Sequence, residues 1–150
     1  MNLEIPMRLA ALAASAFAAA AAAAGPIPQL PPLGGLLSPP PDRLTVTVEH
    51  NGASRVANGT FTLECEPAGG THPEARRACA RLDRFAQAGK DPFAPVPPDE
   101  VCSGVYGGRA VARITGSWQG RRIDASFSRK NGCEISRWKD LEPVLPSARS

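Results

Sequence analysis

The sequence predicts a single α+β domain that contains an antiparallel hairpin and is held together by disulfides. Three observations predict this class. Apolar and polar residues alternate in four segments, one segment repeats apolar residues at three- and four-residue steps, and the chain has an even number of cysteines, all beyond residue 60. A chain of 150 residues is long enough for one hydrophobic core.

The four alternating segments have the period of two that is typical of strands with one buried face. They are residues 44–48, 60–65, 112–118 and 122–128. Gln119 and Gly120 lie between the third and the fourth segment. Because a two-residue connection that ends in glycine favours a tight turn, these two segments predict an antiparallel hairpin.

Residues 75–86 predict the clearest helix, and its buried stripe includes Cys79. Pro73 suits the first helical position, Thr71 or His72 would cap the helix, and Gly89 would end it. We therefore interpret His72 as a capping residue and not as a catalytic base. Near the C-terminus, residues 134–139 fit a short helix or a last strand, and residues 145–150 are expected to be frayed.

The N-terminal part is expected to lie outside the domain. Residues 1–24 follow the pattern of a secretory signal peptide, with an alanine-rich apolar run after Arg8 and small residues at its end. A membrane anchor is the weaker alternative because the run is short, and translation could start at Met7 instead of Met1. Residues 25–42 contain seven prolines and no hydrophobic period, which predicts a disordered arm. The exported, extracellular domain would then occupy residues 43–150.

An even number of cysteines in a small exported domain predicts two disulfides. Four cysteines allow three connectivities, of which sequential pairing is the simplest, and residue spacing alone leaves the choice open. A Cys65–Cys79 bridge would tie the predicted helix to the second strand, and the far end of the hairpin could return Cys133 to Cys102. The spacing does not fit a zinc site, so we expect neither a metal nor another cofactor.

The basic residues are concentrated in the last third of the chain. Residues 101–150 hold nine basic and four acidic residues, a net charge of +5. They are scattered along alternating strands and not clustered with aromatic residues, so we expect a solvated basic face and no nucleic-acid partner. After signal cleavage we expect no membrane association either.

One short stretch has the sequence features of an extended segment that a partner could bind. Four prolines between residues 92 and 98 forbid a helix before it, and Gly107-Gly108 lets the chain turn away after it. Such an extended segment could lie in a protease cleft as a substrate does. Its residues are Val101, Cys102, Ser103, Gly104, Val105 and Tyr106.

Residue types that serve catalysis are present, but their arrangement does not favour an enzyme. Ser103, His72 and Asp99 could be imagined as a triad, yet no G-x-S-x-G motif places a serine on a strand-to-helix turn. Cysteines in an even, exported set are normally oxidised and are then not nucleophiles. We therefore expect no catalytic residue.

Several short motifs follow one another in a fixed order around the four cysteines. They are Leu44-Thr45-Val46, Leu63-Glu64-Cys65, Gly70-Thr71-His72-Pro73, Ala78-Cys79, Gly116-Ser117-Trp118-Gln119-Gly120-Arg121-Arg122, Phe127-Ser128 and Cys133-Glu134. In these motifs, residues 43–138 resemble the subtilisin inhibitor-like (SSI-like) family of secreted bacterial serine protease inhibitors. The resemblance implies an antiparallel sheet covered by two helices, the disulfides Cys65–Cys79 and Cys102–Cys133, and commonly a homodimer formed through the sheet.

The resemblance also implies a reactive site. The scissile bond would be Gly104–Val105, and Asn131 would support the loop from behind. Numbered from that bond, the loop would supply Val101 as P4, Cys102 as P3, Ser103 as P2, Gly104 as P1, Val105 as P1′ and Tyr106 as P2′. The family usually has proline at P2 and a large side chain at P1, and both are missing here. An empty S1 pocket would forgo about 1.5 to 3 kcal/mol of burial.

The sequence thus predicts a secreted inhibitor of extracellular subtilisin-like serine proteases. The alternative is a related secreted binding module that has lost inhibition.

Overall fold

The structure is a computed structural model that describes residue 25, residues 41–52 and residues 57–148. The predicted signal peptide and nearly all of the proline-rich arm lie outside the described residues. From residue 41 onward the described chain forms one compact unit. No helix in the described ranges is long and apolar enough to cross a membrane.

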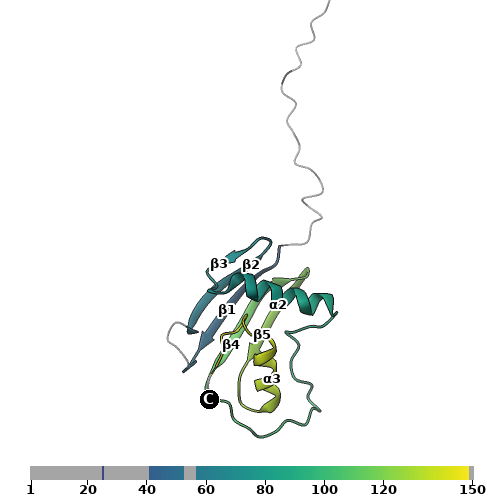
Figure 1. The fold of residues 1–150 in the computed structure, drawn as a ribbon. Coiled ribbons are helices and arrows are strands. Elements are labelled where there is room, and N and C mark those ends of the chain that lie inside the picture. Colours follow the sequence, from purple (N-terminus) through teal and green to yellow (C-terminus); the bar gives the residue numbers. More distant parts are fainter. Residues whose placement is uncertain (1–24, 26–40, 53–56, 149–150) are drawn as a thin grey trace, which may run out of the picture. The chain divides into compact units, whose positions relative to one another are not determined.

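The centre of the fold is a five-stranded sheet in which every neighbouring pair is antiparallel (Figure 1). The strand order is β3-β2-β1-β4-β5. The strands are β1 (Arg43–Glu49), β2 (Gly59–Cys65), β3 (Ala68–Gly70), β4 (Val111–Trp118) and β5 (Arg121–Phe127). All four predicted strands are confirmed, and the short edge strand β3 was not predicted.

Two helices pack on one face of this sheet: α2 (Ala75–Gln87) and α3 (Gly132–Asp140) (Figure 1). The inward side chains of the strands and the buried residues of both helices form one hydrophobic core. The core includes Leu44, Val46, Val48, Leu63, Ala78, Cys79, Leu82, Ile114, Phe127 and Trp138. The α+β class, with a sheet covered by two helices, is therefore confirmed.

The start of α2 differs from the prediction. Its N-cap residue is Glu74, which makes no side-chain capping bond, so the assignment of Thr71 or His72 as the cap is wrong. His72 is buried instead: its Nδ1 accepts a hydrogen bond from the Glu74 amide at 3.1 Å, and its Nε2 lies 3.0 Å from the Val144 carbonyl. His72 thus joins the turn before α2 to the C-terminal segment. The predicted end at Gly89 is confirmed by its left-handed φ of 62°.

The β4–β5 hairpin turns as predicted. Gln119 and Gly120 both have positive φ, 50° and 69°, which is the conformation of a type I′ turn. This turn matches the right-handed twist of the two strands.

The C-terminal segment is ordered and buried. Leu141, Val144 and Leu145 are fully buried, and the Trp138 indole donates a hydrogen bond to the Pro146 carbonyl at 2.8 Å. The expectation of a frayed end is therefore wrong for residues 145–148. The choice left open for residues 134–139 is resolved as a helix, α3.

Candidate functional site

The predicted presentation loop lies in the long segment between α2 and β4, and its tip is exposed. Val101 is 94% exposed, Val105 61% and Tyr106 62%. In the described part of the chain, one more large apolar side chain is exposed, Val111 at 38%. Burying exposed apolar side chains under a partner is favourable, so their concentration in one loop makes this loop the candidate contact surface.

Residues 91–100, which lead to the loop and are called the approach segment here, are fixed first at Asp91 and Phe93. Asp91 accepts a hydrogen bond from the Phe93 amide at 2.9 Å and forms an ion pair with Arg121 at 3.1 Å. Partial burial raises the pKa of Asp91, but the bonds from Arg121 and from the Phe93 amide outweigh it, so the pKa lies below the ordinary value. The buried Phe93 ring packs edge-to-face on Trp118, with centroids 5.3 Å apart.

A disulfide and helix α3 hold the loop just before the proposed scissile bond. The disulfide Cys102–Cys133 joins the loop to the first turn of α3. One residue further on, the Ser103 carbonyl accepts a hydrogen bond from the Gly132 amide at 3.0 Å. This amide is one of the free donors at the start of a helix, so α3 uses it to hold the loop. The second predicted bridge, Cys65–Cys79, ties β2 to α2, and both pairings are confirmed.

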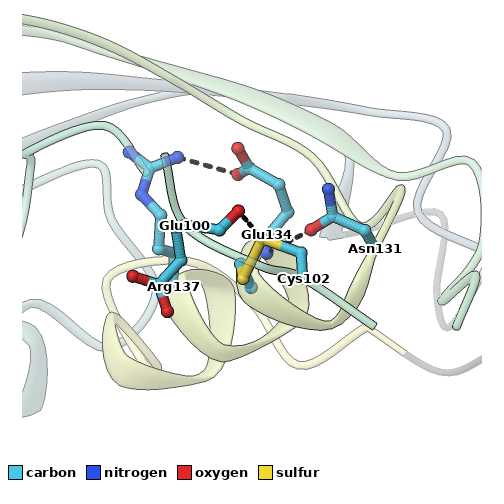
Figure 2. Close-up of a disulfide and its surroundings, with 6 residues drawn as sticks. Glu100, Cys102, Asn131, Glu134 and Arg137 are labelled. Carbon is cyan, nitrogen blue, oxygen red and sulfur yellow. Dashed lines mark hydrogen bonds and ion pairs between the residues drawn. A yellow bond between two sulfur atoms is a disulfide. The ribbon is translucent and has the colours of Figure 1, made fainter. Parts of the chain in front are cut away.

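Asn131 caps the helix that carries Cys133. Its Oδ1 accepts a hydrogen bond from the Glu134 amide at 2.9 Å, as Figure 2 shows. The cap fixes the first turn of α3, to which both Cys102 and Ser103 are attached. Direct support of the loop by the Asn131 side chain stays a prediction; the contact described here acts through α3.

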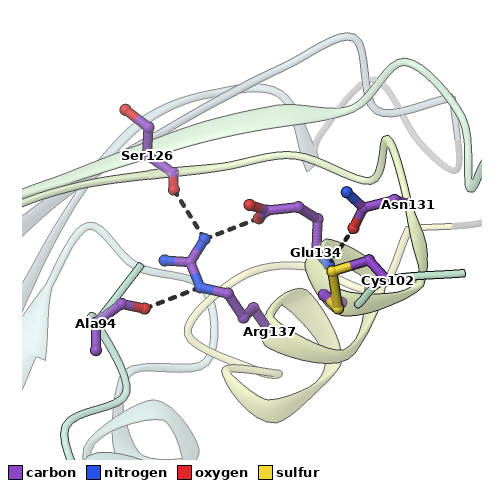
Figure 3. Close-up of polar contacts among 7 residues, drawn as sticks. Ala94, Cys102, Ser126, Asn131, Glu134 and Arg137 are labelled. Atoms are coloured by element: carbon purple, nitrogen blue, oxygen red, sulfur yellow. Dashed lines mark hydrogen bonds and ion pairs between the residues drawn. A yellow bond between two sulfur atoms is a disulfide. The ribbon is translucent and has the colours of Figure 1, made fainter. Parts of the chain in front are cut away.

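A second side chain of α3, Arg137, holds the approach segment (Figure 3). Its Nε donates to the Ala94 carbonyl at 3.0 Å, and its Nη1 donates to the Ser126 carbonyl at 3.3 Å. Nη1 also pairs with Glu134 at 2.8 Å, and the guanidinium lies 4.4 Å from the centre of the Phe127 ring. Arg137 therefore connects the approach segment, α3 and β5.

Downstream of the proposed bond, the chain is held at Gly107. The Gly107 amide donates to the Arg129 carbonyl at 2.7 Å, and the Nε of the buried Arg129 donates back to the Gly107 carbonyl at 2.8 Å. A Cβ at Gly107 would lie 2.8 Å from Cγ1 of Ile135. Gly108 has a φ of 104°, which favours glycine. The two glycines thus serve close packing and a turn.

The structure does not assemble a catalytic triad. Both ring nitrogens of His72 are engaged under the C-terminal segment, so His72 has no free nitrogen to serve Ser103 as a base. Within the described ranges, no group of three or more His, Cys, Asp or Glu side chains could hold a metal ion.

Sequence reasoning missed Arg129, Gly132, Ile135 and Arg137. Their roles depend on where α3 lies against the loop, and the sequence pattern does not give that placement. The Asn131-Gly132 pair could have indicated a helix start, because asparagine is a favoured N-cap.

An exposed loop that a disulfide holds on a small α+β domain is the arrangement expected of one class of protein, the substrate-like protease inhibitors. The sequence profile described as subtilisin inhibitor-like matches residues 40–131. The chain therefore belongs to the subtilisin inhibitor-like family, whose members are protease inhibitors.

Two Streptomyces proteins agree with this assignment by their sequences. Subtilisin inhibitor-like protein 1 of Streptomyces cacaoi is 38% identical over 90 residues, which cover 57% of this chain and 77% of the relative. Subtilisin inhibitor-like protein 4 of Streptomyces lavendulae is 37% identical over 98 residues, covering 63% and 81%. Among solved structures, Streptomyces caespitosus sermetstatin in complex with Bacillus licheniformis subtilisin is 26% identical, with a TM-score of 0.45 over 71% of this chain and 99% of that one.

Proposed function

We propose that this protein is a secreted inhibitor of subtilisin-like serine proteases that binds through residues 101–106, with Gly104–Val105 as the bond presented to the enzyme. The observation that carries the proposal is the contrast within the loop. The carbonyl of Ser103 and both backbone groups of Gly107 are hydrogen-bonded to the domain, while Val105 and Tyr106 between them are exposed.

The loop would bind as a substrate does. Its extended backbone would pair with the enzyme's substrate cleft, and the Gly104 carbonyl would enter the oxyanion hole. Hydrogen bonds and the disulfide order the loop before binding, so the entropy of ordering is not lost on association. If the bond were cut, Cys102 and Gly107 would keep both new ends attached to the domain. The Val105 amine would stay in place for religation.

Export belongs to the same proposal. The alanine-rich residues 1–24 support export, which mass spectrometry of the secreted protein would test by finding a mature N-terminus near Gly25.

We also propose a homodimer formed through the open face of the sheet. In the described chain, both helices lie on the other face, and the open face carries Thr45, Arg113, Thr115 and Asp124. Light scattering at high micromolar concentration tests this proposal. A monomer would contradict it.

Stoichiometric titration of subtilisin tests inhibition. Protease activity should fall linearly to zero at one loop per enzyme, and Tyr106→Ala should weaken the inhibition. Val111→Ala, which removes an exposed apolar side chain outside the loop, is the matched control and should behave as wild type. Rapid digestion of the loop without inhibition would instead favour the alternative, a binding module that has lost inhibition.

A further inference from the structure

The chain's own fold does not explain why residue 104 is glycine. No heavy atom beyond the neighbouring residues lies within 4 Å of the position that a Cβ of Gly104 would occupy, and its φ is outside the left-handed region. Gly107, by contrast, has a reason in the domain, because its Cβ would lie 2.8 Å from Cγ1 of Ile135 and 3.1 Å from Nε of Arg129. Any reason for glycine at residue 104 therefore lies in the partner.

Three other exposed positions of the loop carry apolar side chains, whereas Ser103 at P2 is exposed and polar. Val101 at P4 is 94% exposed, and Val105 and Tyr106 at P1′ and P2′ are 61% and 62% exposed. These side chains remain available to fill pockets on both sides of the scissile bond. Apolar side chains are thus available at P4, P1′ and P2′, but not at P1 or P2.

Resting on the function proposed above, we propose that the loop is matched to a serine protease whose S1 pocket is closed to side chains. In such an enzyme, a Cβ-bearing P1 residue would push the loop away, whereas glycine lets the backbone approach the catalytic serine. Affinity then comes from Val101 on one side of the bond and from Val105 and Tyr106 on the other.

The test uses two forms of one enzyme: subtilisin with its open S1 pocket, and a variant of it in which a large side chain fills S1. Inhibition constants are measured for the wild-type inhibitor, Gly104→Met, Val101→Ala and the control Val111→Ala. Thermal unfolding of each inhibitor variant confirms that it is folded.

We expect wild type to inhibit the filled-S1 enzyme at least as tightly as the open one. Gly104→Met should bind the open enzyme about 10- to 100-fold more tightly than wild type does, and should lose inhibition of the filled enzyme by at least a similar factor. Val101→Ala should weaken inhibition of both enzymes by about tenfold, because P4 would be a main anchor. Val111→Ala should change nothing.

Two results would overturn the inference and leave inhibition itself intact: wild type binding the filled enzyme at least about tenfold more weakly than the open one, or Val101→Ala binding as wild type does. Digestion of the wild-type loop by both enzymes without inhibition would refute the proposed function, and this inference with it.

Discussion

The two disulfides join very different parts of the molecule. Cys65–Cys79 connects two regular elements, β2 and α2, and Cys79 lies in the hydrophobic core. Cys102–Cys133 connects an irregular, exposed loop to the first turn of α3. The first bridge supports the domain, whereas the second restrains the segment that a partner would contact. Both bridges therefore stabilise the fold, and the second would in addition order the loop before a partner binds it.

Removing each bridge separately is the strongest test of this difference, with the largest expected effect. The sequence separations of 14 and 31 residues give the two bridges similar stabilisation, about 3 and about 4 kcal/mol in the chain-entropy model. Replacing Cys102 and Cys133 by serine should also turn the inhibitor into a substrate, weakening inhibition by about 100-fold or more. Replacing Cys65 and Cys79 is the matched control.

Chemical denaturation and subtilisin titration, run on both double variants at a temperature where each is folded, separate the two effects. Equal losses of inhibition would contradict the division of roles between the bridges.

Substitutions at Gly104 test what the second bridge holds in place. Gly104→Met should improve inhibition of subtilisin by roughly 1.5 to 3 kcal/mol through burial in S1, and Gly104→Lys should create inhibition of trypsin-like enzymes. The space around Gly104 is empty, so neither side chain should disturb the fold. Tight-binding titrations measure both. Unchanged constants for both variants would show that Gly104 is not at P1.

Arg137 extends the restraint from the disulfide to the approach segment. Arg137→Met should weaken inhibition by about tenfold, because the Ala94 carbonyl loses its donor and Glu134 loses its ion pair. Arg113→Met is the control: Arg113 pairs with Asp124 on the open face of the sheet, whereas Arg137 lies in α3 on the other face. Arg137→Lys should restore part of the inhibition. If both methionine variants inhibited equally well, Arg137 would have no role in positioning the loop.

Two glycine substitutions compare the held and the free part of the loop through folding stability. Gly107→Ala should cost about 1 to 3 kcal/mol of folding stability, because its Cβ would overlap Ile135. Gly104→Ala should leave stability unchanged or raise it by about 0.4 to 1 kcal/mol, because it restricts the unfolded chain. Thermal unfolding compares them, and a destabilised Gly104→Ala would mean that the loop is not free at this residue.

The smallest expected effect is a pH dependence at Asp91, where the approach segment begins. The pKa of Asp91 is below 3.8 in the folded protein because Arg121 and the Phe93 amide stabilise its charged form. The folded state therefore gains stability from Asp91 above the unfolded pKa and loses it as the pH falls through the folded value. Denaturation between pH 5 and about 2.5 should show a slightly steeper loss for wild type than for Asp91→Asn. Parallel curves for the two proteins would show that Asp91 makes no such contribution to stability.

Local patterns in the sequence were enough to predict the strands, the hairpin turn and α2. Residues 44–48 alternate strictly and form β1, and Gln119-Gly120 forms the expected tight turn. The prolines, glycines and cysteine were enough to predict the loop itself. The contacts that hold the loop could not be predicted, because Arg129 and Arg137 bond to residues that are distant in sequence.

The prediction for the C-terminal segment was wrong for a similar reason. Val144 and Leu145 are only two apolar residues, and they lie next to prolines, so they indicate neither a helix nor a strand. The sequence therefore predicts a frayed end for residues 145–150. Their burial comes from tertiary contacts with His72 and Trp138, which no local pattern encodes.

The most direct measurement of the central claim is the position of the bond that a protease cuts. The protein is incubated with a small amount of subtilisin until slow cleavage is detectable, then reduced and analysed by mass spectrometry. We predict two fragments, one ending at Gly104 and one beginning at Val105, which stay joined by Cys102–Cys133 until reduction. A first cut elsewhere in the chain, with Gly104–Val105 intact, would contradict the proposed reactive site.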